Sequence, residues 1–238
     1  MHKYIVLVLG IAVLLGSVAC QQKHPVSVYI DDSFRVTAGE TPPVLKIAVL
    51  PFTSSINQSD DPDDVASRTF ESVFTKKLDD RNDYNFVSPG TIAFAVEREG
   101  WQSDYKKFLR DYPHSDKPDM DLLGRIAAAV QCDAFLIGVV DTWDKDEVDY
   151  RENASATTTV GATISIVDAS VKPGRLLFRA IDEDYLESAR SEVSDRTVST
   201  SGTGLVRADR EAQLYKAPPY EEVVIKVVES LVASLPAR

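Results

Sequence analysis

The sequence has 238 residues and a formal net charge of −11, because 37 acidic residues face 26 basic ones. A surface with this charge repels phosphate backbones and anionic headgroups, which argues against nucleic-acid binding. The hydrophobic fraction of 44% is ordinary for a globular protein and too high for a disordered one.

The first twenty residues have the three parts of an export signal. A basic start at residues 1–3 precedes an apolar run at residues 4–15, and small residues at positions 16–19 come before Cys20. A transmembrane helix needs about 20 apolar residues, so this run favours a cleaved signal peptide over an uncleaved membrane anchor. Residues 1–19 are therefore predicted to be a signal peptide.

The cleavage site also carries a resemblance. Val18-Ala19-Cys20 resembles the lipobox of bacterial lipoproteins, although Ser17 stands where leucine is usual. The resemblance implies a lipid thioether on Cys20. Gln21 follows, not Asp, which by the sorting rule of that family implies the periplasmic face of the outer membrane. Residues 20–43 mix polar residues with three prolines and are predicted to be the lipidated tether.

The next elements alternate strands with helices. Residues 45–52 are rich in branched side chains, which predicts a buried strand. The acidic run at 60–64 is interpreted as capping a helix over 66–78. A calcium loop is the alternative, but the run lacks the Asp-x-Asp-x-Asp-Gly spacing. A second strand is predicted at 84–87, and Ser88-Pro89 opens a helix that runs through about Glu99.

Two further helices lead into a long strand. Aromatic residues recur along one face of residues 101–112, a pattern that favours a core face over a ligand box. A helix over 122–130 precedes a strand at 134–143. Cys132 lies between them and is the only thiol left once Cys20 carries lipid, so no intrachain disulfide can form. Its position favours a small buried side chain over a reactive thiol.

The last third of the chain predicts an antiparallel meander and a closing helix. Residues 157–167 alternate apolar and polar side chains, and another strand is predicted over 175–185. Residues 188–219 are polar and are predicted to be a long insertion. Residues 220–235 show one dense apolar face, which predicts a packed helix.

The order of elements is therefore β-α-β-α-α-α-β-β-β-α. The simplest architecture for this order is an α/β domain with a single mixed β-sheet covered by helices. We expect residues 44–238 to form one such domain, interrupted by the insertion at about 188–219.

Several segments resemble a known superfold. Residues 47–52 look like the opening strand shared by the amino-terminal domain of TolB, the curli-export lipoprotein CsgG and the synthase activator LpoB. Residues 123–140 resemble the helix-to-strand segment of that group, and residues 164–178 resemble its hairpin. The resemblance implies a non-enzymatic envelope lipoprotein that binds other envelope components, often in rings.

The residues needed for common catalytic devices are sparse. His24 and His114 are the only histidines after cleavage, and no Gly-x-Ser-x-Gly elbow is present. Two histidines and one thiol do not make a usual zinc site, and no glycine loop that cradles phosphate is present. No catalytic residue, metal or cofactor is therefore predicted. Carboxylates are abundant, so a periplasmic hydrolase with a carboxylate pair stays an alternative.

The predicted function is a membrane-anchored periplasmic adaptor or accessory factor of a larger envelope assembly, in export or cell-wall synthesis. A subunit of a CsgG-like secretion channel is a second alternative, disfavoured because no pair of long hairpins with lipid-facing alternation is visible. The arginines of the insertion are predicted to contact an acidic surface on a second copy or on an envelope protein, with a solvated loop as the alternative. These arginines are Arg190, Arg196, Arg207 and Arg210.

Overall fold

The structure is a computed structural model that describes residues 26–35, 45–149, 155–170, 174–188 and 214–237. Its strands are β1 (Ser27–Ile30), β2 (Lys46–Val49), β3 (Thr53–Ser54), β4 (Asn85–Val87), β5 (Ala134–Asp146), β6 (Val148–Asp149), β7 (Thr157–Asp168), β8 (Leu176–Glu187) and β9 (Leu214–Tyr215).

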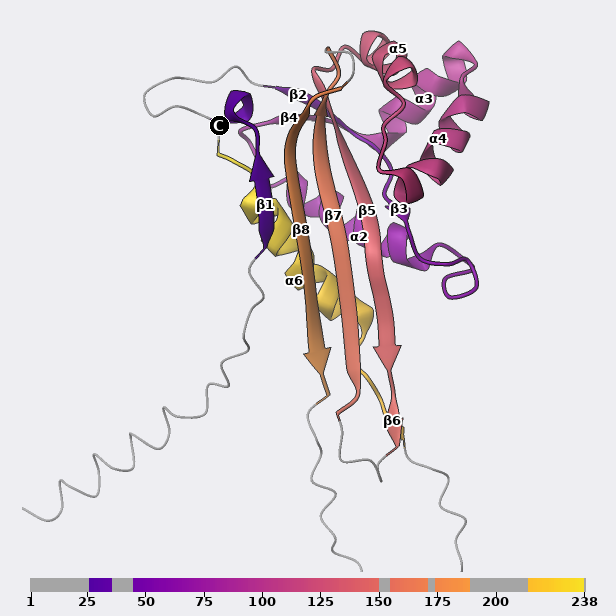
Figure 1. Ribbon diagram of the computed structural model, residues 1–238, viewed down its shortest axis with the longest axis vertical. Coiled ribbons are helices and arrows are strands. Elements are labelled where there is room, and N and C mark those ends of the chain that lie inside the picture. Colours follow the sequence, from indigo (N-terminus) through magenta and orange to yellow (C-terminus); the bar gives the residue numbers. More distant parts are fainter. Residues whose placement is uncertain (1–25, 36–44, 150–154, 171–173, 189–213, 238) are drawn as a thin grey trace, which may run out of the picture.

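Seven of these strands form one mixed sheet (Figure 1). The order is β1-β8-β7-β5-β2-β4, and β3 pairs with β5 farther along the strand. The strands β1, β8, β7 and β5 are antiparallel to one another, whereas β2, β3 and β4 pair in parallel. The single mixed sheet predicted from the sequence is confirmed. A separate two-stranded ribbon joins β6 to β9.

Helices cover both faces of the sheet. On one face lie α2 (Val65–Leu78) and α6 (Tyr220–Ser234), and on the other lie α3 (Pro89–Glu99), α4 (Gln102–Ser115) and α5 (Met120–Val130). Figure 1 shows α6 running along the back of the long strands, while α3, α4 and α5 gather at one end. Among the described helices, none has both the length and the apolar composition needed to cross a membrane.

The sequence pattern explains why α6 lies where it does. Five apolar residues of its predicted face are fully buried against β7, β8 and α2, which confirms the packed closing helix. They are Val223, Val224, Val227, Val228 and Leu231.

One glycine allows the core beneath α2 to close. A Cβ at Gly138 of β5 would lie 2.1 Å from Cε1 of Phe52, so the ring of Phe52 fills the space that any other residue would need. That ring is itself held by Phe70 and Phe74 of α2, at centroid distances of 5.1 and 4.9 Å. Gly138 is therefore a packing requirement of the fold.

The acidic run before α2 caps the helix, as the sequence predicts. The Asp61 carboxylate accepts hydrogen bonds from the backbone N–H groups of Val65 at 2.8 Å and Ala66 at 2.9 Å. These groups have no partner within the helix, so the buried Asp61 satisfies two donors that would otherwise be unpaired.

The domain begins earlier than the sequence suggests. Residues 27–30, expected in the tether, form the edge strand β1 on β8, and a short 3-10 helix (Asp32–Phe34) follows. Phe34 is only 1% exposed and contacts the ring of Phe178, which fixes this segment to the core. The predicted signal peptide and most of the predicted tether lie outside the described residues, as does most of the predicted insertion.

Candidate functional site

One face of the sheet changes from apolar to polar along the strands β5, β7 and β8. Successive side chains of a strand point to opposite faces, so register fixes which ones share a row. The row beneath α5 is apolar, with Phe135 beside Val167, and both are buried. The next rows on this face are Ile137–Ser165–Arg179, Val139–Thr163–Ile181, Thr142–Gly161–Glu183 and Asp144–Thr159–Tyr185.

The last two of these rows, together with Ile181, form a surface that no described helix covers (Figure 1). We call this surface the open face. Ile181 is 42% exposed and Tyr185 is 39% exposed on it. The open face consists of Thr142, Asp144, Thr159, Gly161, Ile181, Glu183 and Tyr185.

A side-chain bridge crosses the open face above a glycine. Thr142 Oγ1 donates a hydrogen bond to Glu183 Oε2 at 2.7 Å. A Cβ at Gly161 would lie 2.9 Å from that Thr142 oxygen and 3.1 Å from the Glu183 oxygen. A larger residue at this position would therefore push against the bridge. The surface is therefore held in place by side-chain contacts as well as by the strands.

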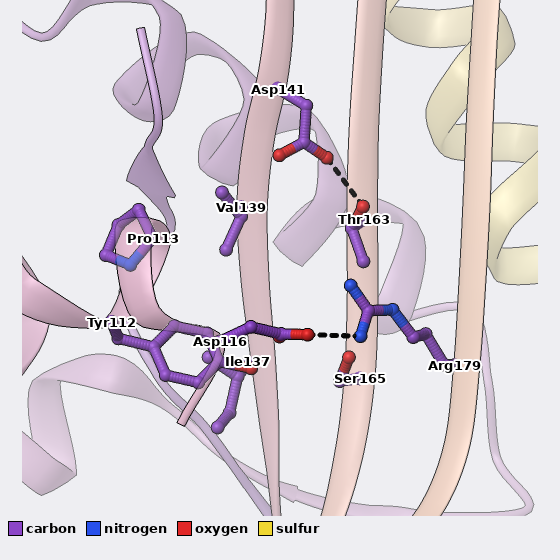
Figure 2. Close-up of a pocket in the computed structure, with 9 residues that line it drawn as sticks. All are labelled: Tyr112, Pro113, Asp116, Ile137, Val139, Asp141, Thr163, Ser165 and Arg179. Atoms are coloured by element: carbon purple, nitrogen blue, oxygen red, sulfur yellow. Dashed lines mark hydrogen bonds and ion pairs between the residues drawn. The ribbon is translucent and has the colours of Figure 1, made fainter. Parts of the chain in front are cut away.

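A pocket lies where the covered rows meet the open face. Its volume is about 90 Å³. The end of α4 forms one wall, β5 forms the floor, and β7 and β8 form the other side (Figure 2). The residues that line it are Tyr112, Pro113, Asp116, Ile137, Val139, Asp141, Thr163, Ser165 and Arg179.

Charged groups occupy the two ends of this pocket. Asp116 follows α4 in a left-handed conformation, with φ of 52°, and its carboxylate pairs with Arg179 at 2.6 Å. At the other end Asp141 accepts a hydrogen bond from Thr163 Oγ1 at 2.5 Å. Figure 2 shows the Arg179 guanidinium on the side of Asp116, with Thr163 and Asp141 at the opposite end.

Burial changes the acidity of two groups in the pocket. Although Asp141 is exposed as a whole residue, the protein around its carboxyl group raises the pKa of that group, against the hydrogen bonds from Thr163 and Ser55. The phenol of Tyr112 is buried, which raises its pKa to about 12. Tyr112 is therefore a neutral wall of the pocket at physiological pH.

The side chains of the pocket can bind hydrogen-bond donors and charged groups. The hydroxyl groups of Thr163 and Ser165 lie beside carboxylates and a guanidinium, and His114, in the last turn of α4, is exposed to solvent. In the part of the chain that the structure describes, no three His, Cys, Asp or Glu side chains gather as metal ligands.

The site residues predicted from the sequence lie elsewhere. Cys20 and the four insertion arginines are outside the described residues, so they stay predictions. Cys132 is free and partly buried, and burial raises the pKa of its thiol to about 11. The predicted helix capping is confirmed at Asp61.

The pocket is not among the sites predicted from the sequence. Two charged residues in otherwise apolar strands are its trace in the sequence. Asp141 follows seven buried residues of β5, and Arg179 interrupts the apolar start of β8. Tyr112 belongs to the aromatic face that the sequence predicts to be core, and its exposed fraction of only 4% confirms this. The same residue forms a wall of the pocket.

No protein-family model matches the chain, and no curated protein matches it. Solved structures do. The chain is similar to PelC from Paraburkholderia phytofirmans, solved as a dodecamer, with 13% identity and a TM-score of 0.47 over 90% of this chain and 97% of that chain. It is similar to lipoprotein GNA1162 from Neisseria meningitidis, with 15% identity and a TM-score of 0.38 over 63% of this chain and 88% of that one.

The C-terminal domain of LpoB from Escherichia coli is also similar, with 12% identity and a TM-score of 0.34 over 59% of this chain and 82% of that chain. LpoB is one of the proteins named by the sequence resemblance. At these identities and TM-scores the likeness carries no argument about activity or partners. The function is therefore argued from the residues themselves.

Proposed function

We propose that this protein is a lipid-anchored lipoprotein on the periplasmic face of the outer membrane, where it serves as a non-catalytic adaptor or accessory factor of a larger envelope assembly. The observation that carries the proposal is the open face. It is a polar sheet surface with an exposed tyrosine and an exposed isoleucine, backed by a fully packed core.

The packing behind the open face supports a binding role. The opposite side of the same strands is buried under α6, so the backbone of β7 and β8 is fixed on that side. A rigid surface loses little conformational entropy when a partner binds, and aromatic residues within a polar rim are typical anchors of protein interfaces. Tyr185 and Ile181 have this setting, with Glu183 between them.

The chemistry of the pocket supports a role without catalysis. A relay of hydroxyl, histidine and carboxylate needs a histidine oriented between the other two groups. The Thr163 hydroxyl instead donates directly to Asp141, so this hydrogen bond ties β7 to β5 at the pocket. His114 on α4 is exposed and does not line the pocket.

The N-terminal sequence supports the anchor. A thioether lipid on Cys20 would place the domain a short tether from the membrane, since β1 begins at Ser27. The predicted contacts of Arg190, Arg196, Arg207 and Arg210 with an acidic partner surface belong to the same proposal, and deletion of residues 191–210 tests them by the loss of partners from the folded variant.

The test of the proposed function compares two exposed aromatic residues. Tyr185 lies on the open face, whereas Phe94 on α3 is 66% exposed on a different surface. The Tyr185→Ala variant and the Phe94→Ala control are extracted from membranes in mild detergent. Their masses are measured by light scattering, and co-purifying proteins are quantified by mass spectrometry.

We expect Tyr185→Ala to lose copies or partners by about tenfold relative to wild type, because interface tyrosines often contribute a large share of binding energy. Phe94→Ala should behave as wild type. If both variants keep the wild-type mass and the same partners, the open face does not bind them and the proposal fails.

A further inference from the structure

The Asp141 carboxylate has hydrogen bonds but no direct ion pair, although the charge of Arg179 acts on it from a distance. Its oxygens accept from Thr163 Oγ1 at 2.5 Å and from Ser55 Oγ at 3.4 Å, and both donors are neutral. The one cation of the pocket, Arg179, is paired at 2.6 Å with Asp116. Within the described residues, Asp141 therefore faces the pocket as a carboxylate without an ion-pair partner.

The charge of the pocket selects the sign of its ligand. Two carboxylates and one guanidinium leave one negative charge in the pocket, and the whole chain carries −11. An anion would be repelled by both, whereas a cation would gain from Asp141 and from the overall field. Partial desolvation of the Asp141 carboxyl group, which raises its pKa, adds to the benefit of an incoming positive charge.

The size of the pocket selects the kind of cation. Complete small molecules occupy sites of about 300–1,000 Å³, whereas this pocket measures about 90 Å³. The pocket is therefore too small for a complete molecule of that kind and suits the end of a side chain. Its walls suit the stem of such a side chain, because Val139, Ile137 and Pro113 present apolar atoms beside the charged groups.

We propose that this pocket binds the guanidinium or ammonium end of a basic side chain presented by a protein partner, with Asp141 as its ion-pair partner. The inference rests on the partner-binding role proposed above and names the chemistry of the contact. The pocket borders the open face through the shared row of Val139, Thr163 and Ile181, so one partner can cover both.

A titration with a small probe tests this chemistry without a partner. The full mature chain is labelled at isoleucine and valine methyl groups and kept in detergent micelles. Nα-acetyl-arginine amide is added, with the neutral Nα-acetyl-norleucine amide as the matched probe. We expect saturable shifts of the Ile137 and Val139 methyl resonances with the arginine probe alone.

Three variants assign the effect to the charges. Asp141→Asn keeps the shape of the side chain and should weaken binding of the arginine probe about fivefold, as loss of a half-exposed ion pair implies. Asp80→Asn, an exposed carboxylate after α2, should leave binding unchanged. Arg179→Gln removes a competing cation and should strengthen binding at least about twofold, an outcome that a purely structural role for these residues does not produce.

The proposal is overturned if the norleucine probe shifts the same methyl groups equally, or if Asp141→Asn binds the arginine probe as wild type does. It is also overturned if Arg179→Gln, with methyl dispersion intact, fails to bind more tightly. The titration needs no partner, so it decides the chemistry of the pocket even if Tyr185→Ala keeps the wild-type mass and the same partners, which is the result that contradicts the proposed function.

Discussion

Replacement of Gly138 by alanine tests the packing of the core that supports the sheet. The new Cβ would lie 2.1, 2.3 and 2.5 Å from three atoms of the Phe52 ring, whereas carbon atoms pack at about 3.5–4.0 Å. The ring must therefore move by more than about 1 Å, and Phe70 and Phe74 close the space into which it could move. Overpacking of this kind costs about 3 kcal/mol, which lowers Tm by about 6–12 °C for a domain of this size.

Circular dichroism melting of Gly138→Ala checks this value. The control is Gly124→Ala in α5, where an added Cβ meets nothing within 4 Å and where the better helix propensity of alanine should stabilise by about 0.5–1 kcal/mol. Adding Phe52→Leu to Gly138→Ala should return part of the lost stability, because the smaller side chain leaves room. If Gly138→Ala melts with the wild type, the close contact with Phe52 is not a feature of the folded protein.

Three further predictions follow from the cap, the thiol and the anchor. Asp61→Ala removes both hydrogen bonds to the start of α2 and should cost about 1–2 kcal/mol in urea unfolding, while unchanged stability would mean that the cap is dispensable. In the Cys20→Ser variant, Cys132 is the only thiol. Burial raises its pKa to about 11, so about one thiol in a thousand is ionised at pH 8. Its reaction with a disulfide reagent should then be about a hundredfold slower than that of a free thiol and rise about tenfold per pH unit towards pH 10, whereas rapid reaction at pH 8 would contradict the burial. The same Cys20→Ser variant should lack lipid and either leave the membrane fraction or persist as precursor, and mass spectrometry of the wild-type N-terminus should find an acylated Cys20, since any other N-terminus contradicts the lipoprotein prediction.

The elements that the sequence predicts well are those with a strong period and many buried residues. The strand β5 opens with seven consecutive buried residues, and α6 buries one continuous face, so hydrophobic periodicity alone identifies both. The capping role of Asp61 was equally accessible, because an acidic run just before an apolar period is a helix signal that needs no tertiary information.

The elements that the sequence misses depend on contacts distant in the chain. The strand β1 has four mostly exposed residues, and its backbone pairs with residues 178–181 of β8. Val26, Val28 and Ile30 alternate along it, but the alternation is short and is followed by polar residues, so the segment is easily interpreted as part of the tether. Phe34 also packs on the core, and its partner Phe178 lies far along the chain.

The pocket was hidden for a related reason. Asp141, Thr163 and Arg179 belong to three different strands, and only the register of the sheet brings their side chains together. The position of Asp116 depends on where α4 ends, and the helix continues through Pro113 to Ser115, beyond the point at which a proline predicts a stop. The sequence pattern along one element shows neither the register between strands nor the position of Asp116 relative to them.

Photo-crosslinking in the living cell tests the central claim most directly, namely that the open face binds an envelope partner or a second copy. Benzoyl-phenylalanine replaces Tyr185 on the open face in one strain and Phe94 on α3 in another, and each strain is irradiated before membranes are isolated. The account predicts a discrete crosslinked band, identified by mass spectrometry as one envelope protein or as this chain itself, from position 185 and not from position 94. Crosslinks that are absent at position 185, or equally strong and of the same composition at both positions, would contradict it.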